Sequence, residues 1–145
     1  MQESGYVRAV TEMTDDELID AAASLLRPHL VEGRLFGNVA STLVTADGNR
    51  HSGVCVDTGS GTGFCAEHAA IAAMVTAGEY RIVKIVAVWR DEDGSLYVLP
   101  PCGRCREFIR QVDPTNLEAE VILGRHDSAP LRELLPRHGW PQALG

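Results

Sequence analysis

Two short cysteine-containing stretches constrain this chain more than any other part of its sequence. They are Cys65-Ala66-Glu67 and Pro101-Cys102-Gly103-Arg104-Cys105. A segment rich in Gly, Ser and Thr over 57–63 precedes the first, and Pro100-Pro101 leads into the second. Helical spacing follows each stretch, so we expect both to lie at the start of a helix. Together they supply three thiols and one carboxylate, which we interpret as two halves of one site.

The number of thiols favours a catalytic zinc site. Structural zinc sites use four protein ligands, whereas catalytic sites use three and leave one position for water. Cys65, Cys102 and Cys105 supply three ligands, and the remaining cysteine, Cys55, stands apart in the sequence. Glu67 can take a proton from water bound to the zinc and pass it to a leaving amine. The two stretches therefore predict a zinc-dependent hydrolase.

Charge and hydropathy exclude several other classes of protein. A net charge of −7 with scattered arginines argues against a nucleic-acid partner, because such binding depends on Lys and Arg at phosphates. There is no uncharged apolar run of about 18 residues, so no membrane span is expected. Residues 1–14 lack the layout of a signal peptide. We therefore expect a cytoplasmic protein with reduced cysteines that acts on a small molecule.

The order of expected elements predicts an α/β fold. Thr14 and Glu17 form a capping-box pattern before an amphipathic helix over 15–27. The further expected elements are strands over 39–45 and 52–56, a helix over 65–77, a buried strand over 82–89, an extended piece over 96–99, a helix over 103–112, a strand over 119–123 and a helical turn over 131–135. We expect one domain over residues 1–145, a three-layer α/β/α sandwich around a mixed sheet of about five strands.

The same residues are also compatible with less specific roles. The cysteines can be buried thiols or a redox pair, but a thioredoxin-like pair is expected early in the chain and leaves Glu67 unexplained. Glu67 alone would be an ordinary acid in a helical first turn. The glycines over 59–63 do not have the spacing of a phosphate-binding loop, and no Lys-Ser or Lys-Thr follows them. We expect a flexible loop at the edge of a pocket there.

The joined motifs resemble those of the cytidine deaminase superfamily, in its small three-cysteine branch, and most resemble the blasticidin-S deaminases. Zinc nucleobase deaminases combine a cysteine-ligated zinc, a glutamate that is not a ligand and a Pro-Cys-x-x-Cys motif. The likeness runs from Asp15 onward. Its matching stretches are Val39-Ala40-Ser41 with Asp47-Gly48, both cysteine motifs through Arg106, and Arg132-Glu133-Leu134-Leu135-Pro136.

The resemblance implies a function and roles for particular residues. It implies that Cys65, Cys102 and Cys105 bind Zn²⁺, that Glu67 shuttles protons, and that the backbone at Ala66 helps to hold the pyrimidine ring. The implied reaction is hydrolytic deamination of a cytosine-type nucleoside, either cytidine, deoxycytidine or a blasticidin S-like compound, with release of ammonia. Members of this branch are typically cytosolic homotetramers. Both pyrimidine salvage and antibiotic resistance are compatible with this reaction.

The sequence departs from the family pattern where the substrate is held. Cytidine deaminases usually carry Asn-x-Glu at the end of the second strand to grip the ribose, and here that segment is Cys55-Val56-Asp57. Asp57 retains a carboxylate that can accept from a hydroxyl, whereas Cys55 cannot replace an amide. Asn38, at the start of the preceding strand, is a third candidate substrate contact. His68 stands where the family often has arginine to offset thiolate charge, a role that Arg104 and Arg106 can share.

Two alternative functions remain open from the sequence. One is a non-catalytic, zinc-stabilised binding domain, in which Glu67 would be dispensable. The other is a deaminase that acts on another aminated heterocycle.

Overall fold

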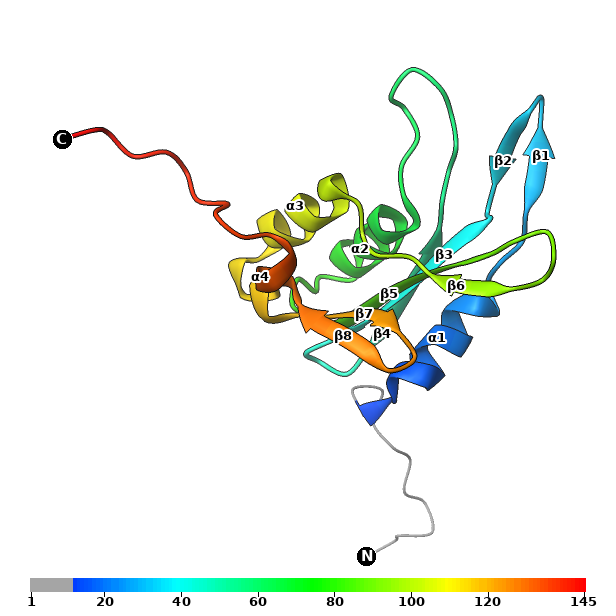
Figure 1. The fold of residues 1–145 in the computed structure, drawn as a ribbon, viewed down its shortest axis with the longest axis horizontal. Helices are drawn as coiled ribbons and strands as arrows, with labels where there is room; N and C mark the ends of the chain where they lie inside the picture. The colour runs from blue at the N-terminus through cyan, green and yellow to red at the C-terminus, as the bar shows by residue number, and fades with distance from the viewer. Residues whose placement is uncertain (1–11) are drawn as a thin grey trace, which may run out of the picture.

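A mixed sheet forms the centre of the protein. The structure is a computed structural model that describes residues 12–145. Most of the 1–14 segment, which was expected not to be a signal peptide, therefore lies outside the described residues. The strand order is β4-β3-β5-β7-β8, and β6 also pairs with β5 (Figure 1). The strands are β3 (Val39–Thr45), β4 (Arg50–Val54), β5 (Ile82–Arg90), β6 (Leu96–Val98), β7 (Glu120–Gly124) and β8 (Asp127–Pro130).

Strand β5 organises this sheet. Strand β3 pairs with it antiparallel along nearly its whole length. On the opposite edge, β7 pairs in parallel at Lys84 and Ile85, and β6 pairs antiparallel from Val88 to Arg90. The apolar run predicted to be buried on both faces thus forms the central strand.

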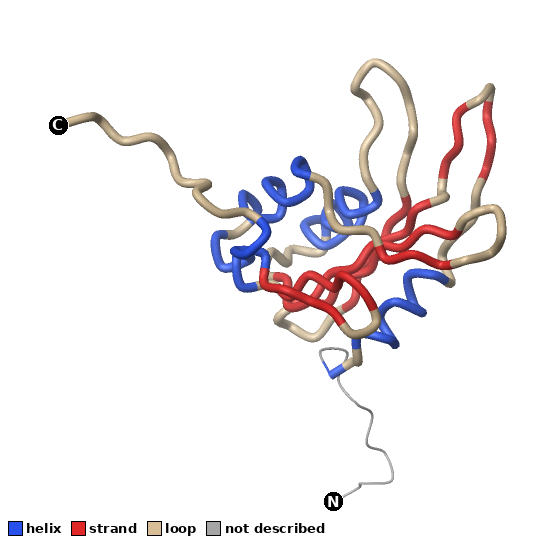
Figure 2. Tube along the Cα trace, viewed as in Figure 1, coloured by secondary structure: helices blue, strands red, loops and turns tan. Residues whose placement is uncertain are grey.

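Helices cover both faces of the sheet, as Figure 2 shows. Helix α1 (Asp15–Ala23) packs on one face. Helices α2 (Ala66–Thr76), α3 (Gly103–Val112) and α4 (Leu131–Leu134) pack on the other, with a 3₁₀ helix at Pro114–Glu118. Alternate strand residues separate the two cores, because Ile85 contacts the α2 side and Val86 the α1 side. The predicted three-layer α/β/α sandwich is confirmed.

Helix α1 is shorter than the sequence predicted. Its capping box at Thr14 and Glu17 is present, but the helix ends at Ala23 instead of residue 27. The Leu25 and Leu26 amides bond three residues back, so the chain continues as turns. Proline at position 28 disfavours helix at the residue before it. Arg27 N–H instead donates to Gly37 O at 3.0 Å.

Three strands were not predicted from the sequence. Strands β1 (His29–Val31) and β2 (Arg34–Phe36) form a separate projecting hairpin, and β8 adds an edge to the main sheet. With β8 the main sheet has six strands instead of about five. Strand β4 also begins and ends earlier than the expected 52–56. Within residues 12–145, no helix is long and apolar enough to span a membrane.

Candidate metal centre and active site

Both cysteine motifs begin a helix. Cys65 is the N-cap residue of α2 and Cys102 is the N-cap residue of α3, each with extended backbone angles. Neither side chain bonds back to the helix. The first-turn N–H groups therefore remain available to stabilise negative charge on nearby sulfur. This confirms the expectation that two helix N-termini present the thiols.

Three sulfur atoms meet between the two helices. The Sγ atoms of Cys65, Cys102 and Cys105 all lie within 4.8 Å of one another. Cys65 Sγ and Cys102 Sγ are 3.8 Å apart. A tetrahedral zinc site with Zn–S bonds of about 2.3 Å places sulfurs about 3.8 Å apart, so this spacing fits zinc. Among the described residues, no other group of three His, Cys, Asp or Glu ligand atoms is as close.

The electrostatics of the three thiols also suit a dication. Burial raises the pKa of Cys65, and it raises the pKa of Cys105 with a further contribution from the charge on Glu67. Burial opposes ionisation of Cys102 as well, but backbone N–H groups of Cys105 and Arg104 bring the pKa of Cys102 below its usual value. Three thiolates so close together need a compensating charge, and Zn²⁺ supplies it with thiolate-preferring chemistry.

Glu67 lies in the first turn of α2, beside this cluster. Its side chain is buried, with only 6% of the residue exposed. Burial raises the pKa of Glu67, while its own backbone N–H and the Cys105 thiol act in the opposite direction. A buried carboxyl with a raised pKa can hold and release a proton nearer to neutral pH than an exposed one.

His68 is placed against one of the three sulfurs. Its Nδ1 lies 3.4 Å from Cys105 Sγ. The ring stacks on Phe108, with centroids 4.1 Å apart and planes 10° from parallel. Burial lowers the pKa of His68, and the nearby Arg104 lowers it further. The structure therefore places His68 where it can share a hydrogen bond with the Cys105 sulfur.

The two arginines of the second motif have other partners. Arg106 donates from Nε to Pro101 O at 2.8 Å and from Nη1 to Leu134 O at 2.9 Å. This residue therefore ties the start of α3 to α4. Arg104 is exposed, and its Nη1 donates to Gly63 O at 3.4 Å, at the end of the 57–63 loop.

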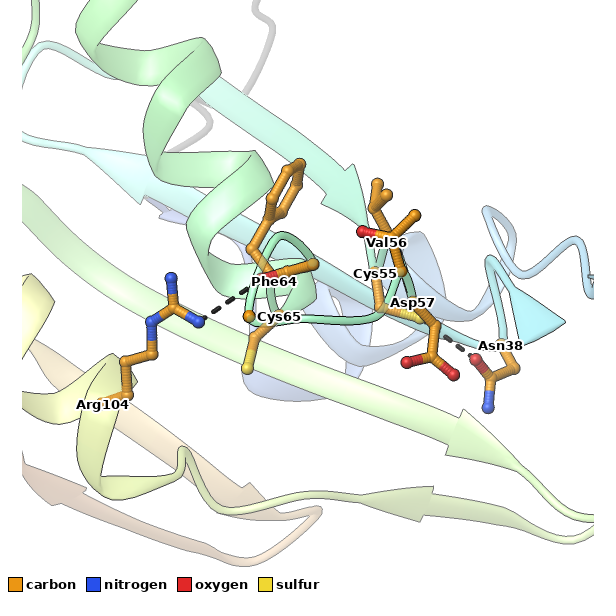
Figure 3. A pocket seen from close by; sticks show the side chains of 10 residues that line it. Asn38, Cys55, Val56, Asp57, Phe64, Cys65 and Arg104 are labelled. Atoms are coloured by element: carbon orange, nitrogen blue, oxygen red, sulfur yellow. Dashed lines mark hydrogen bonds between the residues drawn. The ribbon is translucent and has the colours of Figure 1, made fainter. Parts of the chain in front are cut away.

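Two pockets adjoin the cysteine cluster. The smaller one, of about 190 Å³, lies against Glu67 and has mostly apolar walls. The larger one, of about 380 Å³, is open to solvent and contains Asn38, Asp57 and Arg104 (Figure 3). Cys55 and Cys65 line both pockets. Two adjacent pockets suit a two-part ligand, with a flat apolar part near Glu67 and a polar part farther out.

The structure thus gathers the residues predicted from sequence. Ala66, Glu67, Cys65 and Cys102 line the smaller pocket, and Cys105 completes the sulfur cluster behind it. The remaining candidates, Asn38, Cys55 and Asp57, line the larger pocket. The loop over 59–63, expected at a pocket edge, supplies Gly61 and Gly63 to the larger pocket. Sequence reasoning did not identify the other walls, which are Val39, Leu99 and Pro100 in the smaller pocket and Val56, Thr58 and Phe64 in the larger. The Pro100-Pro101 pair was the available signal, since it fixes an extended approach to α3.

The glycine-rich loop over 57–63 forms part of the rim of the larger pocket. Val56 and Phe64 close its base with two backbone hydrogen bonds of 3.1 and 2.9 Å. Gly63 is required there, because a Cβ atom would lie 2.5 Å from Val56 O. The loop follows β4 and leads into Cys65, so its closed base fixes the entry to α2.

Comparisons with known proteins agree with this site. The chain matches no protein-family model. It is 30% identical to the blasticidin-S deaminase of Bacillus cereus over 113 residues, which cover 66% of this chain and 81% of that protein. With its α/β/α fold and three-cysteine cluster, the chain belongs to the cytidine deaminase superfamily.

Solved structures of cytidine deaminases share the fold. The Mycobacterium leprae enzyme superposes with a TM-score of 0.70 at 26% identity, over 87% of this chain and all of that one. The Burkholderia pseudomallei enzyme superposes with a TM-score of 0.69 at 27% identity, over 86% of this chain and 98% of that one.

Proposed function

We propose that this protein is a zinc-dependent aminohydrolase that converts a cytosine nucleoside to its uracil form with release of ammonia. The observation that carries the proposal is the meeting of three cysteine sulfurs within 4.8 Å beside the buried carboxyl of Glu67. Similarity to a blasticidin-S deaminase and to cytidine deaminases supports the same reaction class.

The proposed roles follow the geometry of the site. Cys65, Cys102 and Cys105 hold the zinc ion. Bound zinc supplies an acidified water as the nucleophile for hydrolysis. Glu67 takes a proton from the attacking water at a carboxylate oxygen and delivers protons to the ring nitrogen and to the departing amine. The C–O bond forms first and the C–N bond then breaks, so the water oxygen stays on the ring as a carbonyl and the amino group leaves as ammonia.

The smaller pocket is the proposed site of the pyrimidine ring. Its apolar walls, including Val39 and Leu99, exclude water from the faces of a flat ring. The backbone at Ala66, the first residue of α2, contacts the ring from the helix side. This position brings the amino-bearing carbon next to both the sulfur cluster and Glu67.

Cytidine, deoxycytidine and blasticidin S-like nucleosides are the proposed substrates. They share the aminated ring and differ in the part that would occupy the larger pocket. A panel of kcat/KM values for the three, with adenosine and guanosine as other aminated heterocycles, distinguishes them. The proposal expects turnover of at least one cytosine compound and none of the purines. Turnover of a purine alone would reassign the substrate class.

We also propose a homotetramer in the cytoplasm. Large apolar side chains stand out from the fold, with Trp140 87% and Leu30 67% exposed, as is typical of surfaces that meet another chain. All four cysteines are free, as a reducing compartment would keep them. Light scattering on the purified protein should give about four times the chain mass of 15.7 kDa. A monomer mass would contradict this assembly.

A further inference from the structure

Asn38 and Cys55 form a side-chain pair inside the larger pocket. The Cys55 thiol donates to Asn38 Oδ1 across 3.1 Å, although the residues are 17 positions apart. Figure 3 shows this bond, with Arg104 on the opposite side of Cys65 from Asn38 and Asp57. Asn38, Cys55 and Asp57 all line the pocket. Its polar groups are therefore divided between two ends.

The backbone holds the pair in a fixed register. Asn38 immediately precedes β3, and Cys55 immediately follows β4. Cys55 N–H donates to Val39 O at 3.0 Å, and Gly37 N–H donates to Cys55 O at 3.2 Å. The antiparallel pairing of the two strands thus continues through this point. Groups on strand ends are positioned more accurately than groups on free loops.

The bond determines what Asn38 can offer to a ligand. Its Oδ1 accepts from the thiol, so its amide NH₂ remains as a donor. The carboxylate of Asp57 can only accept. In the described part of the chain, neither Asn38 Nδ2 nor the Asp57 carboxylate has a hydrogen-bond partner. A ligand group that satisfies both must accept one hydrogen bond and donate another, which is the property of a hydroxyl.

We infer that Asn38 and Asp57 bind one sugar hydroxyl of the substrate and that Cys55 is the positioning residue for the Asn38 amide. The inference rests on the proposed function, which places the base in the smaller pocket and its sugar in the larger one. Cys55 cannot itself replace an amide, and the structure supplies the amide from the neighbouring strand. The sugar contact is thereby restored by residues from two strands instead of one.

The test compares cytidine with 2′-, 3′- and 5′-deoxycytidine, each of which lacks one hydroxyl. The wild-type protein should lose about 10- to 100-fold in kcat/KM on one of the three. In Asn38→Ala, kcat/KM for cytidine should fall by a similar factor. The value for that analogue should then be no lower than the value for cytidine. In Cys55→Ala, the ratio of kcat/KM for cytidine to kcat/KM for that analogue should fall about 3- to 10-fold. Cys55→Ser keeps a hydrogen-bond donor and should restore most of this ratio.

A structural role alone would not reproduce this pattern. Zinc content and melting temperature of the Asn38 and Cys55 variants should match the wild type. Asn49→Ala, which removes an amide outside the pocket, is the matched control and should keep full discrimination. If Asn38→Ala discriminates among the analogues as the wild type does, the subsite is wrong. If Cys55→Ala discriminates among the analogues as the wild type does, the positioning role is wrong.

Failure of the proposed function has a separate signature. One outcome is that the wild type deaminates none of the four nucleosides. In that case, titration calorimetry measures the affinity for uridine and its three deoxy analogues and so tests the same subsite. Hydroxyl-dependent binding that Asn38→Ala abolishes would then support the subsite without deamination. Binding that ignores the hydroxyls, or no nucleoside binding, would overturn the inference itself.

Discussion

Cys65 and Cys102 are 37 residues apart in the sequence, yet their sulfurs lie 3.8 Å apart because each residue is the N-cap of a helix. Helices α2 and α3 pack on the same face of the sheet, so their first turns meet. Backbone N–H groups at the start of α3 favour the thiolate form of Cys102. The fold thereby prepares a metal site from two distant segments.

Removing one sulfur should release the metal. Cys102→Ala should lower the zinc content from about one ion per chain to near zero and reduce the melting temperature, because metal binding and folding are coupled. Cys55→Ala is the matched control, since Cys55 lies outside the sulfur cluster, and it should keep its zinc. Elemental analysis with thermal unfolding checks both. Stoichiometric zinc in Cys102→Ala would remove this residue from the ligand set.

Neutralising the buried carboxyl should separate chemistry from structure. Glu67→Gln has nearly the same shape and should retain zinc and fold, but lose about 10²- to 10⁴-fold in kcat, the usual contribution of a proton-transfer group. Steady-state kinetics with metal analysis measures this. An active Glu67→Gln would leave proton transfer to another group.

The close approach of β4 to α2 should tolerate no side chain. A Cβ atom on Gly53 would lie 2.4 Å from Ala69 Cβ and 2.6 Å from Ala70 N. Gly53→Ala must therefore push α2 away, at a cost of about 1–3 kcal/mol in the free energy of unfolding. Gly139→Ala, where a Cβ meets nothing within 4 Å, should change it by less than about 0.5 kcal/mol. Urea unfolding gives both values, and equal stability of the two variants would contradict the packing described.

Acid should remove the contribution of Glu79 to stability. Hydrogen bonds from Thr45, His51 and Asn49 hold the pKa of Glu79 below its usual value of 4.5. A carboxyl whose pKa is depressed by folding stabilises the folded state above its unfolded-state pKa, and this is lost as pH falls through the folded-state value. The urea midpoint of wild type should exceed that of Glu79→Gln at neutral pH, and the gap should close below about pH 4.5.

An exposed carboxyl provides the control for this pH dependence. Glu133→Gln should show little difference from wild type at any pH, because Glu133 is exposed at the end of the fold. A gap for Glu79→Gln that stays constant down to acidic pH would show that its hydrogen bonds do not depend on ionisation.

Local signals explain which parts of the fold the sequence could predict. The helix over 103–112 has its predicted ends because prolines flank it at positions 101 and 114. The central strand was recognisable as an apolar run. In contrast, β1, β2 and β8 have three or four residues each and too little periodicity to identify a strand. They are held by pairing with neighbours, which is a property of the folded chain.

The candidate site also has a part that local sequence predicts and a part that depends on the fold. Its cysteines and Glu67 fall in two short motifs whose spacing carries the chemistry. The hydrogen bond between Cys55 and Asn38 depends on the register of β3 and β4, so no local sequence pattern predicts it. The position of His68 against Cys105 likewise depends on how α2 and α3 pack. Local sequence therefore predicts the members of the cysteine cluster better than the contacts between residues that line the pockets.

Product analysis with zinc-loaded protein of known metal content is a direct test of the proposed deaminase activity. Cytidine, deoxycytidine and blasticidin S are each incubated with protein that carries about one zinc per chain, and ammonia and the uracil-form product are quantified together. Equal amounts of both are expected from at least one of the three compounds. Fully zinc-loaded, folded protein that releases no ammonia from any of them would contradict the proposed deaminase activity.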